Sequence, residues 1–368
     1  MKQTVSLGMC NKGLIGVIVI GVCLGCSRIN ETALFDFPVE SIPDINYTDT
    51  LSPIPVLADA ELTEFAIIDD RVFSYSTSGH DFLSVTSLEG NIPPIYLCHE
   101  GRGPGEFLAM SPTLDYYNGR LGVVDTYIGK YSYLNLKESL DSTRTIIDRE
   151  FDLPWDIKSS HLIRSAYSFG TDSLLVYLIT MASDPQSRKS LDVPEYQLFN
   201  LSTKEVVNTY KCYNPAPARI RKKRTMDLQA LYYSWQCLDS NRDRLCFAML
   251  RMPQINILDI HSGSIRGFRL DDRPRLNSDK MYFYFMSACS YGDKIYALYS
   301  GDEGMEASSL PTSPGALYVF DWDGNIHEKY LLDAPYGRCA VTSDGIYLSK
   351  YEEDTSMGLY FVPMKERD

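Results

Sequence analysis

Short apolar stretches separated by polar turns repeat along most of the chain. Each repeat has a turn rich in Asp, Asn, Gly or Ser, an apolar stretch, and then a second hairpin in which apolar and polar residues alternate. Alternation on both sides of such turns predicts antiparallel β-hairpins. The apolar stretches after the first turns are RVFSY, RLGVVD, SLLVYLI, RLCFAML, KIYALYS and GIYLSKY. Four strands in about 50 residues is typical of a propeller blade.

Six such units fill the chain. They begin near Leu62, Pro112, His161, Leu231, Tyr282 and Gly337. The last unit lacks a fourth strand after LYFVPM, and a strand from residues 31–57 can complete it, so that no bare strand edge remains. We therefore predict an all-β fold, a six-bladed β-propeller of four-stranded antiparallel blades closed by an N-terminal strand. The length of 368 residues alone would suggest two or three domains, but the repeat favours one.

The N-terminal segment has the pattern of a secretory signal. Lys2 and Lys12 precede an apolar run over residues 14–24, and Gly25 and Cys26 follow it. The run is shorter than the roughly 20 residues that span a bilayer. Because it ends at Gly-Cys, it resembles a bacterial lipoprotein signal, which implies that Cys26 is the lipidated first residue of the mature chain. Ordinary secretion without lipidation is the alternative.

These observations divide the chain into three parts. We expect residues 1–25 to be the signal peptide and residues 26–60 to hold the lipidated cysteine, a tether and the ring-closing strand. Residues 61–368 then form the propeller. A composition of 44% hydrophobic and 23% charged residues excludes wholesale disorder. The formal net charge of −13 argues against nucleic acid as a partner, since binding it needs a cationic surface.

The connections between strands differ in length according to their place in the blade. The first-to-second and third-to-fourth turns, which share one face of a propeller, are mostly tight. The connections of the other face are long, and they cover residues 98–111, 181–195, 212–228, 271–280 and 301–315. Long loops on one rim commonly carry binding sites. We predict one elaborated face with the ligand site at or near the central channel; the alternative is that these loops only cap the channel.

The segment GRGPGEF, residues 101–107, is the most distinctive motif. Its three glycines and one proline indicate a fixed irregular loop, from which Arg102 and Glu106 can point at a ligand. The architectural alternative pairs these side chains with each other or with nearby backbone, and places Phe107 in a gap between blades. His99 precedes the loop, and it is the histidine best placed to join a site there.

The longer segment CHEGRGPGEF, residues 98–107, resembles the six-bladed TolB-like or NHL-like propeller lipoproteins of Bacteroidota. The resemblance implies a six-bladed propeller in the cell envelope, with ligands that are mostly unknown. The chain has no room for the additional α/β domain of TolB, so TolB's partners are not carried over. Residues 27–31 lack the acidic run that usually marks surface export in Bacteroidota. The expected location is therefore the outer membrane, with the periplasmic face favoured over the cell surface, which is the alternative.

A basic cluster stands out in this acidic chain. Residues 219–224 read RIRKKR, so that Arg221, Lys222, Lys223 and Arg224 are candidate binding residues. They can attract a phosphate, a sulfated or uronic sugar, or an acidic partner. The alternative is an ordinary solvated loop.

Known catalytic and metal-binding motifs are missing from the sequence. No histidine pair has zincin spacing, and no nucleophile elbow, Walker A or Rossmann fingerprint occurs. The segment from Asp321 to Asn325 resembles the start of a calcium loop, but Leu332 stands where the twelfth ligand should be, which favours a hairpin turn. Cys237 and Cys246 flank one turn and can face each other. The apolar contexts of the cysteines favour buried thiols with few or no disulfides.

Three functional hypotheses follow. The first is a lipid-anchored binding or scaffold module for a glycan, a peptide or an envelope protein, without a cofactor. The second is a calcium-dependent lactonase or esterase, in which Asn, Asp and Glu side chains converge on a metal in the channel; a channel lined by Tyr and Arg would argue against it. The third is a structural subunit of an envelope complex, which an exposed apolar rim would favour.

Overall fold

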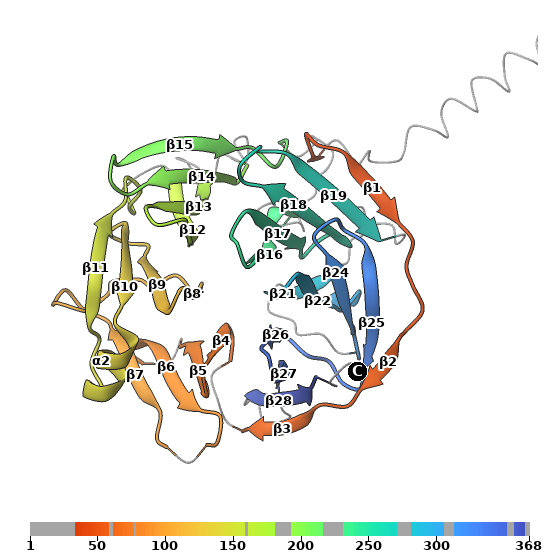
Figure 1. The fold of residues 1–368 in the computed structure, drawn as a ribbon, viewed down its shortest axis with the longest axis horizontal. Coiled ribbons are helices and arrows are strands. Elements are labelled where there is room, and N and C mark those ends of the chain that lie inside the picture. The colour runs from red at the N-terminus through yellow and green to blue at the C-terminus, as the bar shows by residue number, and fades with distance from the viewer. Residues whose placement is uncertain are drawn as a thin grey trace, which may run out of the picture.

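Six antiparallel sheets surround a central axis in the computed structural model (Figure 1). The structure describes residues 34–58, 62–76, 79–90, 92–158, 161–180, 193–215, 231–270, 281–304, 313–351 and 357–364. Across these ranges the fold is almost entirely β, with one short α-helix, α2, at Leu136–Ser142. The predicted six-bladed propeller is confirmed.

The first three blades follow the chain in simple up-and-down order. Blade 1 contains β4 (Phe65–Ile68), β5 (Arg71–Tyr75), β6 (Asp81–Ser87) and β7 (Ile95–His99). Blade 2 contains β8 (Asp115–Tyr117), β9 (Arg120–Asp125), β10 (Lys130–Leu134) and β11 (Ile147–Asp152). Blade 3 contains β12 (His161–Phe169), β13 (Ser173–Thr180), β14 (Glu195–Asn200) and β15 (Glu205–Tyr210).

The remaining blades borrow strands from the N-terminal segment. Blade 4 contains β16 (Ser234–Leu238), β17 (Arg244–Met249), β18 (Gln254–Asp259) and β19 (Ile265–Leu270). Blade 5 contains β21 (Phe285–Tyr291), β22 (Lys294–Tyr299), β24 (Ala316–Asp321) and β25 (Ile326–Leu332). Blade 6 contains β26 (Arg338–Val341), β27 (Gly345–Tyr351), β28 (Met357–Pro363) and β3 (Ile54–Leu57). A separate two-stranded sheet pairs β20 (Met281–Tyr282) with β23 (Glu303–Gly304).

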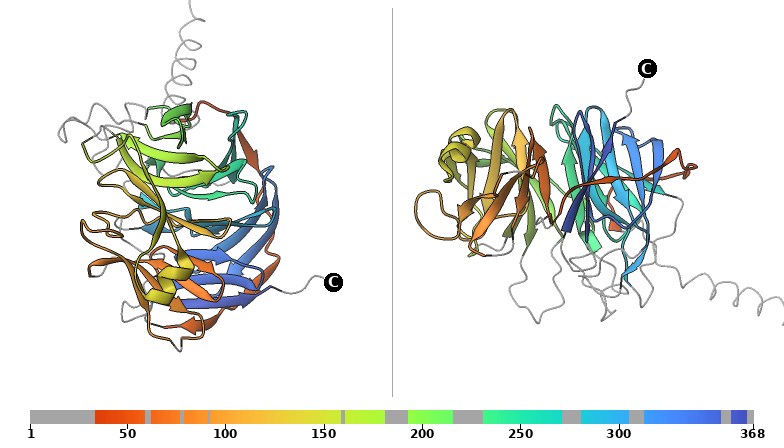
Figure 2. Two further views of the ribbon diagram at one scale, coloured as in Figure 1. Left: turned by 60° about the vertical axis from the view of Figure 1, so that its left-hand side comes forward. Right: turned by 90° about the horizontal axis from the view of Figure 1, so that it is seen from below.

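The N-terminal segment both closes the ring and encircles part of it. Strand β3 pairs antiparallel with β28, with Leu57 opposite Leu359, so the predicted ring-closing strand is present. The same segment holds two additional strands, whose pairing with other blades was not predicted. β1 (Val39–Ile42) pairs parallel with β19, and β2 (Asp49–Leu51) pairs parallel with β25, so that each covers the outer edge of a blade. Figures 1 and 2 show this segment running around the outside of blades 4 to 6.

The hydrophobic core lies between neighbouring blades. The second strands are continuously apolar because both faces of each blade pack against a neighbour, as β9 and β17 illustrate with five consecutive buried residues each. One cluster joins Phe73 and Leu83 of blade 1 to Leu121 and Val123 of blade 2. The apolar runs in the sequence therefore mark the middle of the ring wall.

The N-terminal residues 1–33 lie outside the described residues. They include the predicted signal peptide, residues 1–25, and Cys26. Within the part that the structure describes, no helix has both the length and the apolar character needed to cross a membrane.

Candidate binding site in the central channel

The innermost strands of all six blades surround a cavity of about 280 Å³ on the propeller axis. Side chains near the beginning of these strands meet at one mouth of the cavity. Connections between blades reach this mouth, so it belongs to the face for which long loops were predicted. The lining includes Glu64, Leu114, Arg164, Trp235, Cys289 and Arg338, one from each innermost strand or the residue beside it.

Arg338 is the most firmly held charged group at this mouth. Its Nε lies 3.0 Å from Oε1 of Glu64, and its Nη1 donates to the carbonyl oxygens of Met286 at 3.0 Å and Gly337 at 2.8 Å. Its guanidinium carbon lies 3.9 Å from the centre of the Trp235 ring. Arg338 of blade 6 thus touches elements of blades 1, 4 and 5, and its position is fixed before any ligand binds.

Glu64 completes a partly buried ion pair. Burial raises the pKa of its carboxyl group, and the charge and hydrogen bond of Arg338 act in the opposite direction. Charged groups in a poorly solvated site are costly unless they are paired. The Glu64–Arg338 pair therefore leaves little net charge of its own at the mouth.

Two aromatic rings and a second arginine stand beside this pair. Tyr233 and Trp235 meet edge to face, with ring centres 5.1 Å apart. The guanidinium carbon of Arg164, from β12, lies 5.9 Å from the centre of the Tyr233 ring. Arg164 is exposed, and among the described residues no carboxylate forms an ion pair with it. The buried indole Nε1 of Trp235 has no hydrogen-bond partner.

The middle of the channel is lined by hydroxyl and amide groups. The side-chain oxygen of Gln236 accepts hydrogen bonds from Ser165 at 2.8 Å and Tyr167 at 3.1 Å. Burial raises the pKa of Tyr167 far above its ordinary value, so its phenol remains protonated and donates. These contacts join blades 3 and 4 below the mouth.

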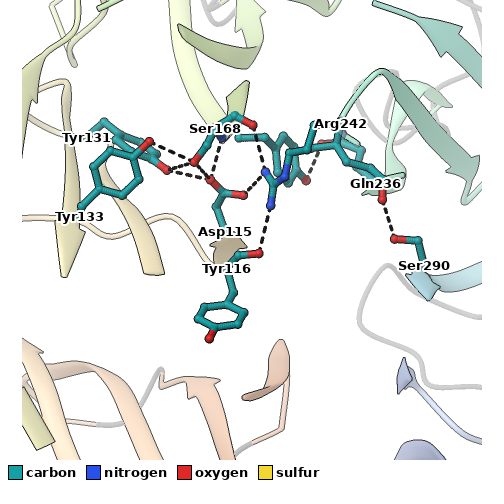
Figure 3. Close-up of polar contacts among 10 residues, drawn as sticks. Asp115, Tyr116, Tyr131, Tyr133, Ser168, Gln236, Arg242 and Ser290 are labelled. Carbon is teal, nitrogen blue, oxygen red and sulfur yellow. Dashed lines mark hydrogen bonds and ion pairs between the residues drawn. The ribbon is translucent and has the colours of Figure 1, made fainter. Parts of the chain in front are cut away.

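A buried ionic network occupies the opposite, tight-turn end of the same blades. Arg242, in the turn between β16 and β17, reaches from blade 4 to Asp115 at the start of β8 (Figure 3). Its Nη1 donates to the carbonyl oxygen of Ser168 at 3.1 Å, its Nη2 donates to that of Tyr116 at 3.0 Å, and its guanidinium stacks over Tyr117 at 4.2 Å. This one side chain therefore links blades 2, 3 and 4.

Both carboxylate oxygens of Asp115 have hydrogen-bond or ion-pair partners. Its Oδ2 accepts from the backbone N–H of Ser168 and from the hydroxyl of Tyr131, each at 2.7 Å. Asp115 is 2% exposed and Arg242 is 7% exposed. Burial, followed by the Asp115 charge, raises the pKa of Tyr131 well above its ordinary value. We interpret this network as architectural, because all of its groups are paired within the protein.

The structure places His99, Arg102 and Glu106 away from the channel lining. His99 ends the outermost strand of blade 1 and pairs with Asp81, while Arg102 is exposed. Glu106 accepts a hydrogen bond from the backbone N–H of Gly103 at 2.6 Å. Phe107 is buried between blades 1 and 2, as the architectural alternative expected. A binding role for the other three residues stays a prediction.

The other candidates from the sequence are the basic cluster and the segment that resembled a calcium loop. Arg221, Lys222, Lys223 and Arg224 lie outside the described residues. The segment that resembled a calcium loop is the hairpin turn between β24 and β25, in which Asp321 accepts from the backbone N–H of Asp323 and of Asn325, each at 2.9 Å. Among the described residues, no three His, Cys, Asp or Glu side chains converge as metal ligands would.

The mouth residues were missed because nothing in their local sequence marks them. Glu64 and Tyr233 directly precede an innermost strand and Arg338 begins one, whereas Arg164 lies within β12. An alignment of the six repeats on those strands would have placed them at similar positions. Their lining of Tyr, Trp and Arg also differs from the Asn, Asp and Glu set that the calcium-dependent hypothesis requires.

Comparison with known proteins shows similarity in fold. No family model matches the chain, and no curated protein sequence matches it. A member of the DUF4221 family from Bacteroides vulgatus ATCC 8482 has a TM-score of 0.50 and 14% identity, over 84% of this chain and 94% of that one. A protein from Bacteroides fragilis NCTC 9343 that is described as exported has a TM-score of 0.49 and 11% identity, over 89% of this chain and 100% of that one. At these identities the likeness concerns the fold alone: the chain is a six-bladed β-propeller similar in architecture to the DUF4221 protein of Bacteroides vulgatus.

Proposed function

We propose that this protein is a ligand-binding propeller of the bacterial cell envelope and that its ligand binds at the mouth of the central channel. The observation that carries the proposal is the convergence of Glu64, Arg164, Tyr233, Trp235 and Arg338 from four blades around one cavity. Concave sites that combine aromatic rings with a few fixed polar groups are the usual form of small-ligand sites. The ring holds these groups rigidly, which limits the entropy lost on binding.

The charges at the mouth favour an anionic ligand. Glu64 and Arg338 compensate each other, which leaves Arg164 as the excess charge among the described residues that line the mouth, in a protein with a net charge of −13. A guanidinium binds a carboxylate through two parallel hydrogen bonds, in bidentate geometry. The adjacent Tyr233 and Trp235 rings can pack against a sugar ring or a peptide backbone. The proposed ligand is therefore a carboxylate-bearing glycan or peptide.

The proposed location rests on the N-terminal sequence. The apolar run over residues 14–24 followed by Cys26 supports export and attachment by lipid at this cysteine. The anchored propeller would act in the envelope, on the periplasmic side of the outer membrane. A labelled fatty acid should be incorporated by the wild-type chain, and incorporation should disappear in Cys26→Ser.

Titration calorimetry on the detergent-solubilised full chain tests the binding proposal. The probes are an oligogalacturonide and its neutral methyl ester, and an acidic peptide and its amidated form. The charged member of one pair should bind, and Arg164→Ala should weaken that binding at least tenfold, because a charge-assisted hydrogen bond contributes about 1.5–3 kcal/mol. Trp235→Ala should also weaken it.

The matched control is Arg149→Ala, on the outermost strand of blade 2, where the side chain is exposed and stacks over Phe151. Its binding should equal that of the wild type. Equal affinity for the charged and neutral probes would contradict the assigned ligand class. Binding that survives both Arg164→Ala and Trp235→Ala would exclude the channel mouth as the site.

An exposed apolar rim supports a second candidate, a subunit of an envelope complex. On blade 2, Tyr127 is 45% exposed, Ile128 41% and Ile157 46%, and the N–H of Ile157 donates to the carbonyl oxygen of Tyr127 at 3.1 Å. These residues lie in connections of the same face as the channel mouth. A double Tyr127→Ser, Ile128→Ser variant should lose in-cell cross-links to a partner while retaining the binding of the charged probe.

A further inference from the structure

Two thiols from different blades meet in the wall of the channel. The Sγ atoms of Cys289, in β21 of blade 5, and Cys339, in β26 of blade 6, are 3.6 Å apart. Both residues line the cavity, Cys289 half-buried and Cys339 6% exposed. In a disulfide the sulfur atoms lie about 2.0 Å apart, so oxidation would bring these two sulfurs about 1.6 Å closer together.

The surroundings of Cys339 stabilise a thiolate. Its sulfur lies 3.6 Å from the hydroxyl of Ser287, whose Oγ also accepts from the Cys339 backbone N–H at 3.1 Å. The hydrogen bond with Cys289 is the largest cause that lowers the pKa of Cys339; burial opposes it, and Ser287 and the Arg338 charge add to the lowering. The same hydrogen bond, together with burial, raises the pKa of Cys289. One thiol is thus the better nucleophile, and the other is placed to resolve its products.

The other described cysteines lack this combination. Cys98 and Cys212 are buried, and burial raises the pKa of each thiol far above its ordinary value. Cys237 and Cys246 stand directly opposite each other in β16 and β17, but both are buried, and their mutual hydrogen bond, with burial, raises the pKa of Cys237. A thiol with a lowered pKa beside a second thiol, both lining the channel, occurs among the described residues only at Cys289 and Cys339.

We propose that Cys289 and Cys339 form a redox-active dithiol that is oxidised through the channel and then links blades 5 and 6 covalently. The oxidant is a disulfide, small or carried by another protein, of the kind found in an oxidising compartment. The Cys339 thiolate attacks one sulfur of that disulfide and the other sulfur leaves as a thiolate. Cys289 then loses its proton and attacks the Cys339 sulfur, which expels the second thiolate. Two electrons pass to the oxidant, and the two cysteine protons end on its two thiols.

The pairing would reinforce the ring beside its ligand-binding mouth. Arg338 precedes Cys339 in the chain and forms the ion pair with Glu64, so a bond at Cys339 fixes the strand that carries this arginine. This inference does not depend on the identity of any ligand, because it rests on the two thiols and their neighbours alone.

The test is a redox titration of the detergent-solubilised full chain. The protein is equilibrated with mixtures of reduced and oxidised dithiothreitol, quenched in acid, alkylated and digested, and its peptides are analysed by mass spectrometry. A Cys289–Cys339 cross-linked peptide should appear in a single two-electron transition, while Cys98 and Cys212 remain fully alkylated. Both cysteines remaining free in fully oxidised buffer, or a cross-link between Cys237 and Cys246 alone, would overturn the proposal.

Single variants test the assigned roles. With 2-hydroxyethyl disulfide as the oxidant, Cys289→Ser should accumulate a stable mixed disulfide at Cys339, because the resolving thiol is missing. Cys339→Ser should form the corresponding adduct at Cys289 more slowly, because Ser287 and the Arg338 charge act on the Cys339 thiol. The control variant Cys212→Ser should retain the wild-type cross-link. Equal rates at the two cysteines would refute the assignment of Cys339 as the nucleophile, and the unsubstituted protein still tests the cross-link if a variant fails to fold.

Discussion

The buried pair of Asp115 and Arg242 allows the sharpest test of how the ring is held together. We predict that Asp115→Asn destabilises the propeller severely. The Asp115 carboxylate accepts hydrogen bonds from Ser168 and Tyr131 and pairs with Arg242. An asparagine amide keeps one acceptor oxygen, but it turns two N–H donors toward groups that are themselves donors, and it leaves the guanidinium without a counter-charge.

The size of the effect follows from the burial of the pair. With Asp115 2% exposed and Arg242 7% exposed, water cannot replace the missing partner. Loss of one partner from a buried ion pair typically costs about 3–5 kcal/mol. At about 2 °C per kcal/mol for a large domain, the melting temperature should fall by about 6–10 °C. The midpoint of urea unfolding should fall in parallel.

Two further variants isolate the cause. Asp148→Asn, on the exposed outer strand β11, makes the same chemical change without a buried partner and should move the melting temperature by less than about 1 °C. Arg242→Met added to Asp115→Asn removes the stranded charge and should recover at least about 2 kcal/mol. If the two variants Asp115→Asn and Asp148→Asn melt together, or if the double variant loses the sum of the single losses, the reasoning is refuted.

Two other predictions concern turns. Partial burial raises the pKa of Asp321, but hydrogen bonds from Asn325 and His327 outweigh it and lower the pKa to about 2. A depressed pKa contributes stability above the unfolded value of about 3.9, and this contribution is lost as pH falls from about 4 to 2. Between pH 4 and pH 2 the melting temperature should therefore fall less for Asp321→Asn than for the wild type. Equal falls in melting temperature for the two proteins would contradict this. Gly105 and Gly119 both have positive φ, but a Cβ at Gly105 would lie 2.7 Å from the carbonyl oxygen of Thr145, whereas nothing lies within 4 Å at Gly119. Urea unfolding should show Gly119→Ala losing about 1 kcal/mol for backbone strain and Gly105→Ala losing clearly more, and equal losses would disprove the clash.

The architecture could be predicted from the sequence because each blade is specified locally. Hairpin turns and apolar strands recur at short separations along the chain. An isolated blade would expose its apolar side chains to water, so each blade packs against its neighbours. The missing fourth strand after LYFVPM indicated that an N-terminal strand completes blade 6, and β3 does so. The pairing of β1 and β2 with blades 4 and 5 could not be predicted in this way. Both are short and largely exposed, and parallel pairing with a distant outer strand leaves no local pattern.

The candidate site was much harder to predict. The segment GRGPGEF is conspicuous in the sequence because of its glycines and proline, but such residues chiefly report backbone geometry. The structure uses Glu106 to bind the backbone of Gly103 and Phe107 to fill the space between blades 1 and 2. Arg242 belonged to a predicted hairpin turn, yet its partner Asp115 is 127 residues away.

The sequence by itself determined the blades, their order and the closure of the ring, because turn chemistry and apolar alternation act over a few residues. Only the tertiary structure decided which side chains share the channel. Glu64 and Arg338 are 274 residues apart in the chain, and they form an ion pair because closing the ring brings blade 6 against blade 1. Cys289 and Cys339, 50 residues apart, meet for the same reason, since innermost strands of adjacent blades lie side by side. Local patterns encode the repeat, whereas ring closure creates contacts between repeats, and those contacts form the site.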